Sequence, residues 1–260
     1  MPSTGELTET PRKELHVFYV LDTSGSMAGQ KISALNHAME ECTQALSELA
    51  KKNGDAKLKI AVMEFNSGFK WVTEHGPEDL EDFMYEYLDA GGLTDIGAAL
   101  TELNKKLSRH EFLSSMTGAL MPVMIFMTDG YATDDYQKAL AEIRNNRWFR
   151  RGTKIGFAIG DDPDVKMISE VVGNSEAVIR TTDLDLFRRL MKFVAVTASM
   201  LVSQSHTTTT ETSGADIVTM AMEGGDIPKD VQVSLPTNTY NSEPVVEDDK
   251  EDDWDDDSDW

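Results

Sequence analysis

Cysteine, basic side chains and long apolar stretches are scarce in this 260-residue sequence. A single cysteine, Cys42, excludes a disulfide within the chain and favours a reducing compartment. The chain has 24 bases against 46 acids, and its net charge of −22 argues against nucleic acid or an anionic membrane as partner. The longest apolar run, residues 119–127, is shorter than the roughly 20 residues of a membrane span. Because the first residues also show no basic and then apolar signal layout, we expect a cytoplasmic protein.

The acidic excess is concentrated at the end of the chain. Residues 204–260 hold 16 acids and two bases, which gives −14, whereas the first 203 residues sum to −8. Such a composition buries too little apolar surface to offset the entropy of ordering, so we predict a largely disordered tail. Within it, residues 215–235 have the pattern of a small hairpin. The predicted organisation is an extension at 1–13, a domain at 14–203 that folds without the tail, and the tail at 204–260.

The first 203 residues alternate between apolar runs and stretches with helical spacing. Short apolar runs predict buried strands, and apolar residues three and four apart predict amphipathic helices. This alternation favours an α/β fold with a mostly parallel sheet between helices, and one antiparallel strand from a hairpin across Ser67-Gly68. The strands are expected at residues 17–21, 58–65, 69–72, 123–127, 155–159 and 177–179, and the helices at 32–49, 96–107, 136–148, 165–172 and 186–201.

Oxygen-bearing side chains follow the predicted strands at the points where ligands bind in such sheets. Asp22, Ser24 and Ser26 come after the first strand, Thr94 precedes a helix, and Asp129 follows the 123–127 strand in an expected accessible loop. Any one of them alone could cap a helix or close a turn. Together they form a set of hard oxygen ligands, which suits Mg²⁺ or Mn²⁺ and, less specifically, Ca²⁺. The five scattered histidines and one cysteine offer no zinc spacing.

The pattern Asp22-x-Ser24-x-Ser26, then Thr94, then Asp129-Gly130 resembles the metal ion-dependent adhesion site (MIDAS) of von Willebrand factor A domains. The resemblance spans about residues 14–203 and implies a three-layer, Rossmann-like fold with one antiparallel strand. It implies direct metal ligation by Ser24, Ser26 and Thr94, with Asp22 and Asp129 acting through water. It also implies a protein partner that supplies an Asp or Glu carboxylate to the metal.

Within that family, the short single-cysteine form is similar to bacterial TerY-type proteins of tellurium-resistance, stress-response or phage-defence systems. This similarity implies an adaptor or regulatory subunit that acts beside a Ser/Thr kinase and a metal-dependent phosphatase. The acidic end of the chain, residues 252–260 with Trp254 and Trp260, is similar to acidic tails in such systems. The tail has three open roles: a carboxylate source that competes for the metal, a docking peptide for a basic groove, or a solubilising segment.

A Mg²⁺-dependent phosphotransfer enzyme with Asp22 as nucleophile is the alternative, because nucleophilic aspartates also follow strands. Residue 24, where such chemistry wants a second carboxylate, is a serine. The lysine that would hold a phosphoryl group is also missing from the later strand ends, since Lys154 begins a strand. No phosphate-binding loop of the P-loop kind is present. We therefore expect a binding module without catalytic residues.

Overall fold

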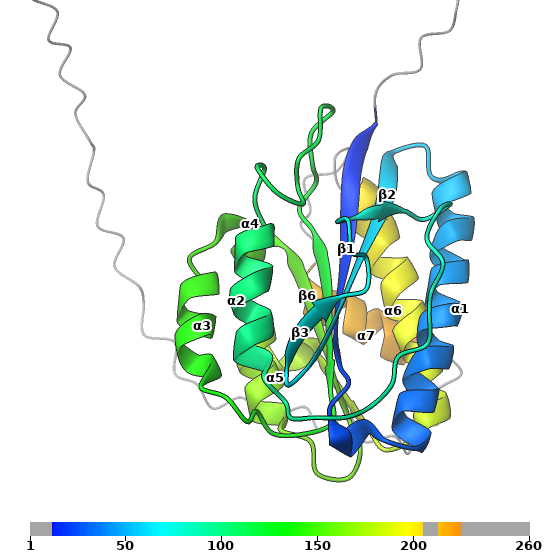
Figure 1. The fold of residues 1–260 in the computed structure, drawn as a ribbon. Helices are drawn as coiled ribbons and strands as arrows, with labels where there is room; N and C mark the ends of the chain where they lie inside the picture. The colour runs from blue at the N-terminus through cyan, green and yellow to red at the C-terminus, as the bar shows by residue number, and fades with distance from the viewer. Residues whose placement is uncertain (1–11, 205–212, 225–260) are drawn as a thin grey trace, which may run out of the picture.

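The computed structural model describes residues 12–204 and 213–224, which form one sheet between two layers of helices (Figure 1). The strand order is β3-β2-β1-β5-β6-β7, and the short β4 also pairs with β2. All pairs along this order are parallel except β2–β3, and β4 is antiparallel to β2 as well. The strands are β1 (Lys13–Asp22), β2 (Ala56–Asn66), β3 (Gly68–Trp71), β4 (Glu78–Asp79), β5 (Val123–Thr128), β6 (Thr153–Ile159) and β7 (Val178–Thr181).

Each face of the sheet carries its own apolar core, because successive side chains along a strand point to opposite faces. On one face the β1 side chains Val17 and Tyr19 pack with helices α1, α6 and α7, and on the other Phe18 and Val20 pack with α2 to α5. The helices are α1 (Gln30–Lys52), α2 (Ile96–Lys106), α3 (Tyr136–Ile143), α4 (Arg147–Arg151), α5 (Val165–Val172), α6 (Leu184–Gln204) and α7 (Gly214–Gly224). The predicted α/β class, the mostly parallel sheet and the antiparallel β3 are confirmed.

Among the described residues, no helix has the length and apolar character that crossing a membrane demands. Cys42 lies on the buried face of α1, where the sequence pattern places it. Burial raises the pKa of its thiol to about 12. The thiol is therefore a packed, unreactive group under ordinary conditions.

Two local predictions are wrong. The helix expected at 136–148 is two helices, because the chain turns after Ile143 and the Asn146 side chain accepts a hydrogen bond from Trp148 N to start α4. The hairpin expected at 215–235 is a helix, α7, over its described part, and residues 225–235 lie outside the described residues.

Helix α7 also corrects the expectation that the chain after residue 203 is a tail. Ala221 lies four residues after Ile217 and three after Val218, so all three side chains are found on one side of α7. All three are at most 2% exposed and belong to the core that α1 and α6 form on the sheet. Residues 214–224 are therefore part of the folded domain, and Gln204 is the last residue of α6.

Candidate metal centre

Strands β1 and β5 are neighbours and parallel, so their carboxyl ends bring Asp22 and Asp129 to the same edge of the sheet. Both oxygens of Asp22 accept hydrogen bonds: Oδ1 from Ser24 N at 2.8 Å and Oδ2 from Thr128 Oγ1 at 2.7 Å. Burial raises the pKa of the Asp22 carboxyl above its usual value; these hydrogen bonds oppose the rise and Asp129 adds to it. Asp22 is thus a fixed carboxylate at the base of the site.

The two serines link the base of the site to Asp129. Ser24 Oγ lies 3.0 Å from Ser26 Oγ, and Ser26 Oγ donates to Asp129 Oδ1 at 2.7 Å. The other oxygen of Asp129 accepts from Lys31 Nζ at 2.5 Å. The Asp129 side chain is fully buried, whereas that of Lys31 is 32% exposed. The expectation that Asp129 lies in an accessible loop is therefore wrong, because Ser26 and Lys31 cover its carboxylate.

Thr94 lies in a loop that backbone hydrogen bonds tie to the serine loop. Gly91 N donates to Thr23 O at 2.8 Å, and Gly25 N donates to Gly92 O at 3.1 Å. Gly92 has a φ of +80°, and a Cβ there would lie 2.7 Å from Ser67 Oγ, so the loop requires glycine at this point. Thr94 itself is buried, and its backbone N donates to Thr133 Oγ1. Its side chain makes no hydrogen bond to the other four predicted ligands.

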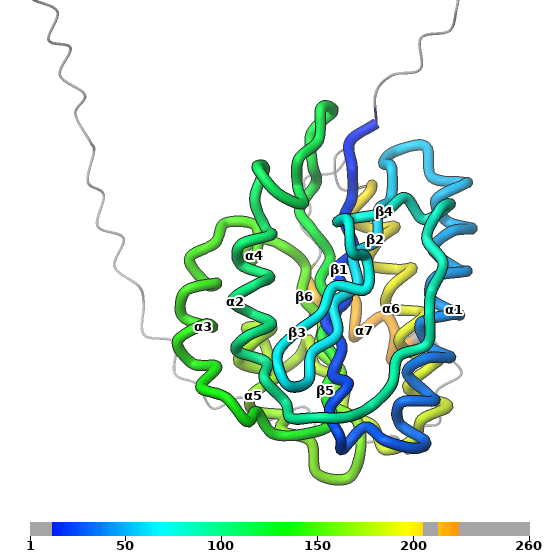
Figure 2. The backbone as a smooth tube through the Cα atoms, in the orientation of Figure 1, coloured from blue at the N-terminus to red at the C-terminus, as the bar shows by residue number. Residues whose placement is uncertain are grey.

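The path to Thr94 is a long connection held by one buried amide. Residues 80–95 run alongside α1 and then cross the carboxyl edge of the sheet toward α2 (Figure 2). The Asn36 side chain on α1 donates to Leu88 O and accepts from Leu88 N, both at 2.9 Å, and also accepts from Tyr85 Oη at 2.8 Å. Asn36 therefore supplies this segment with backbone hydrogen bonds of the kind that a strand or helix would otherwise provide. Nothing in the sequence around Asn36 indicates that role.

The donor set fits a small divalent cation. An octahedral Mg²⁺ holds oxygens at about 2.0–2.1 Å, which places neighbouring ligand atoms about 2.9 Å apart. The Ser24–Ser26 oxygen separation of 3.0 Å is close to that value, so the two hydroxyls expected to bind the metal directly already have a suitable spacing. Among the described residues, no three His, Cys, Asp or Glu side chains are placed to share a metal ion, so the site depends on its hydroxyls.

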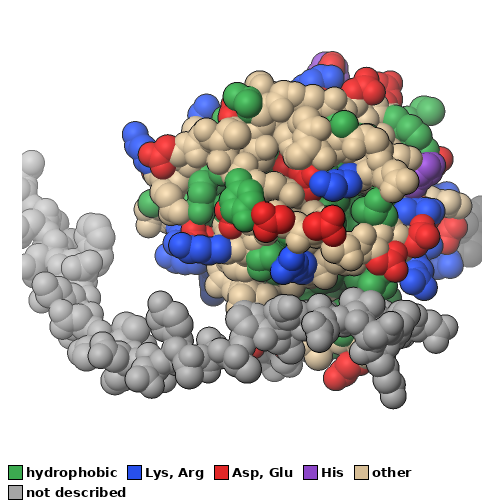
Figure 3. Space-filling model, turned by 90° about the horizontal axis from the view of Figure 1, so that it is seen from below, with side chains coloured by type: hydrophobic (Ala, Val, Ile, Leu, Met, Phe, Trp, Pro, Cys, Tyr) green, Lys and Arg blue, Asp and Glu red, His purple; other side chains and the backbone are tan. Residues whose placement is uncertain are grey.

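The surface around these residues is mixed in charge and carries two exposed apolar side chains. Seen from the carboxyl edge of the sheet, acidic and basic side chains gather near the middle of the face (Figure 3). Leu93, beside Thr94, is 55% exposed, and Tyr131, two residues after Asp129, is 56% exposed. Tyr131 Oη also donates to Asp162 Oδ1 at 3.4 Å. A partner at this edge would meet exposed apolar side chains from the Thr94 loop and from the loop after β5.

Sequence reasoning named the five candidate ligands but missed the residues that hold them. The structure links Asp22, Ser24, Ser26 and Asp129 through a chain of contacts and brings the Thr94 loop against them. The residues it adds are Lys31, Asn36, Thr128 and Thr133. Of these four residues, Thr128 could have been identified from the sequence, because it directly precedes Asp129 at the strand end.

Comparisons with known proteins agree with this fold. Residues 17–132 match the family model described as von Willebrand factor type A domain. A von Willebrand factor type A protein from Catenulispora acidiphila is similar over 73% of this chain and 43% of its own, at 18% identity and a TM-score of 0.54. The pilus adhesin SpaC of Lactobacillus rhamnosus GG is similar over 73% and 31%, at 10% identity and a TM-score of 0.56.

A third similar structure is proximal thread matrix protein 1 of the mussel byssus, solved with a zinc-occupied MIDAS motif. The similarity covers 72% of this chain and 48% of that one, at 18% identity and a TM-score of 0.52. The chain thus spans less than half the length of each of these three structures, and at such identities the likeness concerns the fold. Residues 17–132 therefore resemble a von Willebrand factor type A domain, and the sheet order and these likenesses show that the fold of the chain is similar to the fold of such domains.

Proposed function

We propose that this chain is a metal-dependent protein-binding module whose metal site lies at the carboxyl edge of the sheet. Ser24, Ser26 and Thr94 would bind Mg²⁺ or Mn²⁺ directly, and Asp22 and Asp129 would act through water. When bound, the cation supplies a Lewis-acidic position for a carboxylate of the partner protein. The observation that carries the proposal is the contact chain Ser24–Ser26–Asp129, in which the two serine oxygens lie 3.0 Å apart, close to the spacing of neighbouring Mg²⁺ ligands.

The residues of the chain favour an incoming carboxylate. Three of the five ligands are neutral hydroxyls, and the charge of Asp129 is already balanced by Lys31. A divalent cation held by this set retains positive charge, which attracts an Asp or Glu side chain. Leu93 and Tyr131 add exposed apolar surface near the site, and aromatic side chains such as Tyr131 are enriched in protein interfaces.

The phosphotransfer alternative finds little support in the site. A nucleophilic Asp22 would need an oxygen free to attack, but it is fully buried and both oxygens accept hydrogen bonds. Lys154 stands near the start of β6, at the opposite edge of the sheet, and donates to backbone carbonyls there. We therefore propose binding without catalysis.

The partner class follows from the sequence resemblance to TerY-type proteins. We propose an adaptor or regulatory role in the cytoplasm beside a Ser/Thr kinase and a metal-dependent phosphatase, in a bacterial stress or defence system. The single cysteine, buried and unreactive, accords with a reducing compartment.

Calorimetry with MgCl₂ and MnCl₂ tests the metal site. The chain should bind one cation, and Ser24→Ala combined with Ser26→Ala should abolish the heat. The matched control is Ser33→Ala combined with Ser114→Ala, two exposed serines outside the site, which should leave binding unchanged. Equal binding by the site variant would overturn the ligand assignment.

Affinity capture from the native cytosol tests the function. Kinase, phosphatase or other proteins should be retained by the chain in Mg²⁺, released by EDTA, and absent with the Ser24→Ala, Ser26→Ala variant. Capture that is the same under all three conditions would show that partner binding does not use the metal. A Mg²⁺-dependent phosphatase activity of the pure chain that is lost in Asp22→Asn would instead establish the enzyme.

A further inference from the structure

The segment around α4 is basic in a chain that is otherwise strongly acidic. Residues 143–160 contain five bases and no acid, although the whole chain carries −22. Arg147, Arg150 and Arg151 are exposed, and none of their guanidinium groups forms a hydrogen bond or ion pair with a side chain in the described part of the chain. This face, defined by Arg147, Arg150, Arg151 and Lys154 and called the basic face below, has an unbalanced positive charge.

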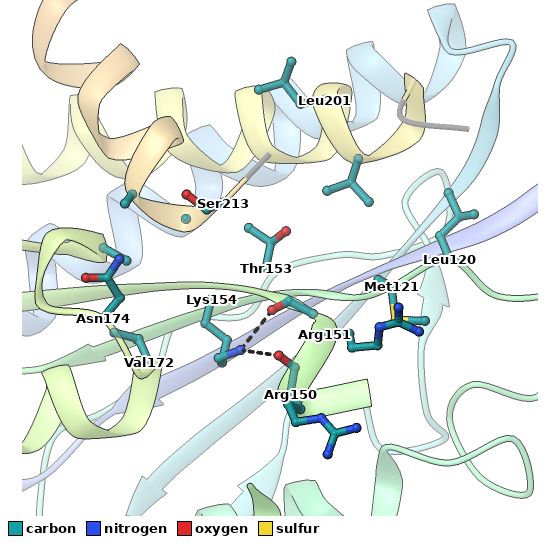
Figure 4. A pocket seen from close by; sticks show the side chains of 15 residues that line it. Leu120, Met121, Arg150, Arg151, Thr153, Lys154, Val172, Asn174, Leu201 and Ser213 are labelled. Atoms are coloured by element: carbon teal, nitrogen blue, oxygen red, sulfur yellow. Dashed lines mark hydrogen bonds between the residues drawn. The ribbon is translucent and has the colours of Figure 1, made fainter. Parts of the chain in front are cut away.

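A cavity of about 490 Å³ adjoins the basic face, at the edge of the sheet opposite the candidate metal site. Figure 4 shows Arg150, Arg151 and Lys154 on the α4–β6 side of this cavity and Leu201 and Ser213 on the side of α6 and α7. Leu120 and Met121, just before β5, add an apolar wall. The cavity thus combines apolar surface with a basic rim.

Lys154 is the least solvated of these bases. Its Nζ donates to Phe149 O at 2.7 Å and to Gly152 O at 3.0 Å, and no described carboxylate pairs with it. Burial lowers the pKa of this ammonium group to about 8. An acidic group beside the cavity would therefore stabilise the charged form of Lys154 as well as the two arginines.

The chain itself contains a segment of complementary chemistry. Residues 243–260 carry 11 acids, one lysine and two tryptophans, Trp254 and Trp260. Each tryptophan can bury on the order of 150–250 Å² in an apolar recess, and the flanking aspartates can pair with arginines. We propose that residues 243–260 of this chain dock on the basic face, with one of these tryptophans in the cavity.

The connection is long enough for this docking. Gly214 and Ala215, at the start of α7, line the cavity, and α7 is about 16 Å long. The 29 residues from 225 to 253 have a root-mean-square reach of roughly 30 Å as a flexible chain. The carboxyl edge of the sheet and the opposite edge with the cavity are both within that range of the end of α7. Charge therefore decides at which edge the segment docks.

Charge disfavours the other two candidate positions. In the chain without a bound cation, Asp95, Asp134, Asp161 and Asp162 lie around the carboxyl edge of the sheet and disfavour an acidic segment there. The groove between α1 and α6 has an apolar floor and bases such as Lys52 and Arg189. There, however, Glu48 lines the groove, and Lys192 is already paired with Glu41 at 3.8 Å. The docking is therefore tested in EDTA, so that the inference does not depend on the proposed metal site.

A spin label on the full chain tests the docking. Ser258→Cys provides the only reactive thiol, since Cys42 is buried, and accepts a nitroxide whose broadening of amide signals reports proximity. We expect loss of peak intensity at residues 120–121, 150–154 and 174, with recovery when the nitroxide is reduced. Raising the salt to about 1 M, where the Debye length is about 3 Å, should restore much of the intensity.

Charge reversal supplies the matched comparison. Arg150→Glu combined with Arg151→Glu should abolish the intensity loss at these amides, whereas Lys52→Glu combined with Arg189→Glu should leave it unchanged. All four side chains are exposed, so both variants should fold, as their spectra will show. If the first variant does not fold, Arg150→Gln with Arg151→Gln replaces it.

Three results would overturn the proposal. Full intensity at the basic face would show that the segment does not dock there. Loss centred on residues 24–26 and 92–94, or on 45–49 and 193–197, would place it at the metal edge or in the α1–α6 groove. Loss that arises between a labelled chain and a separate isotope-enriched chain would assign the contact to a second copy.

Discussion

Lys31 Nζ lies 2.5 Å from Asp129 Oδ2, so a lysine from the first turn of α1 neutralises the carboxylate that follows β5. The same ammonium group is 3.4 Å from Ser26 O, within the serine loop. Gly160, after β6, has a φ of +102°, and a Cβ there would come within 3.3 Å of Lys31 Nζ. Lys31 therefore joins the serine loop to the loop after β5, lies close to Gly160, and carries a positive charge where a cation is expected to act.

Replacing Lys31 by methionine should strengthen metal binding, because the ammonium group competes with the cation for the charge of Asp129. We expect roughly tenfold tighter binding of Mg²⁺, equivalent to about 1.4 kcal/mol, measured by calorimetry. Lys138→Met, on the exposed side of α3, is the control and should not change the affinity. Weaker binding by Lys31→Met would show that the lysine positions Asp129 rather than competing for it.

Asp129→Ala should weaken metal-dependent capture of partners without unfolding the domain. The substitution removes a buried carboxylate, but Lys31 is 32% exposed and can turn toward water. We therefore expect a loss of unfolding free energy of no more than about 1–2 kcal/mol, part of it offset by relief of the repulsion between Asp129 and Asp22. Thermal unfolding and affinity capture measure the two effects, and a collapse of the thermal transition would make Asp129 a structural residue.

Helix α7 should contribute to the stability of the domain. Ile217 is fully buried, so Ile217→Ala should lower the free energy of unfolding by about 2–5 kcal/mol. Met220 on the same helix is 43% exposed, and Met220→Ala should change it by less than about 0.5 kcal/mol. Denaturant unfolding of the two variants compares them directly, and equal midpoints would show that α7 is dispensable, as the sequence pattern alone predicted.

His16 should make the domain sensitive to acid. Burial, with a smaller effect of Lys59, lowers the pKa of His16 from 6.5 to about 4. Because this pKa is depressed in the folded state, the associated stability is complete above pH 6.5 and is lost as the pH falls toward 4. This difference in pKa between the unfolded and folded states corresponds to a loss of about 3 kcal/mol in the free energy of unfolding once the pH lies below both values.

His16→Phe isolates this effect from that of the other titrating groups. The denaturant midpoint of the variant should change less between pH 7 and pH 4 than the midpoint of the unsubstituted chain does. His75→Gln changes an exposed histidine and should retain the full pH dependence. Parallel curves for all three proteins would exclude His16 as the source of the acid sensitivity.

The sheet and most helices were predictable because their patterns are local. The 17–21 and 123–127 runs indicated buried strands, and the helical spacing around Cys42 placed that residue in the core. Helix α7 was missed because Ile217 and Val218 are adjacent and read equally well as strand. Only contact with the sheet, which the local sequence does not encode, decides between the two.

For the site, spacing identified the five candidate ligands but not their electrostatic setting. Asp129 is paired with Lys31, and Leu88 is hydrogen-bonded to Asn36. Lys31 and Asn36 both belong to α1, which is distant in the sequence from the residues that they hold. From the sequence alone, a polar residue of an amphipathic helix cannot be distinguished from a solvated side chain. Only the folded structure shows that a carboxylate or a loop packs against it. Burial of Asp129 was unpredictable for the same reason.

The strand order also determines when the site can exist during synthesis. β1 is the first strand made, yet it lies between β2 and β5, so its second neighbour emerges from the ribosome only after residue 128. The hydrogen bond from Ser26 to Asp129 closes a separation of 103 residues. Such long-range contacts slow folding, and until they form the serine loop has no carboxylate opposite it. A cation bound by Ser26 together with Asp129 would therefore report that β1 and β5 have come together, since no nascent chain that ends before residue 129 contains both side chains.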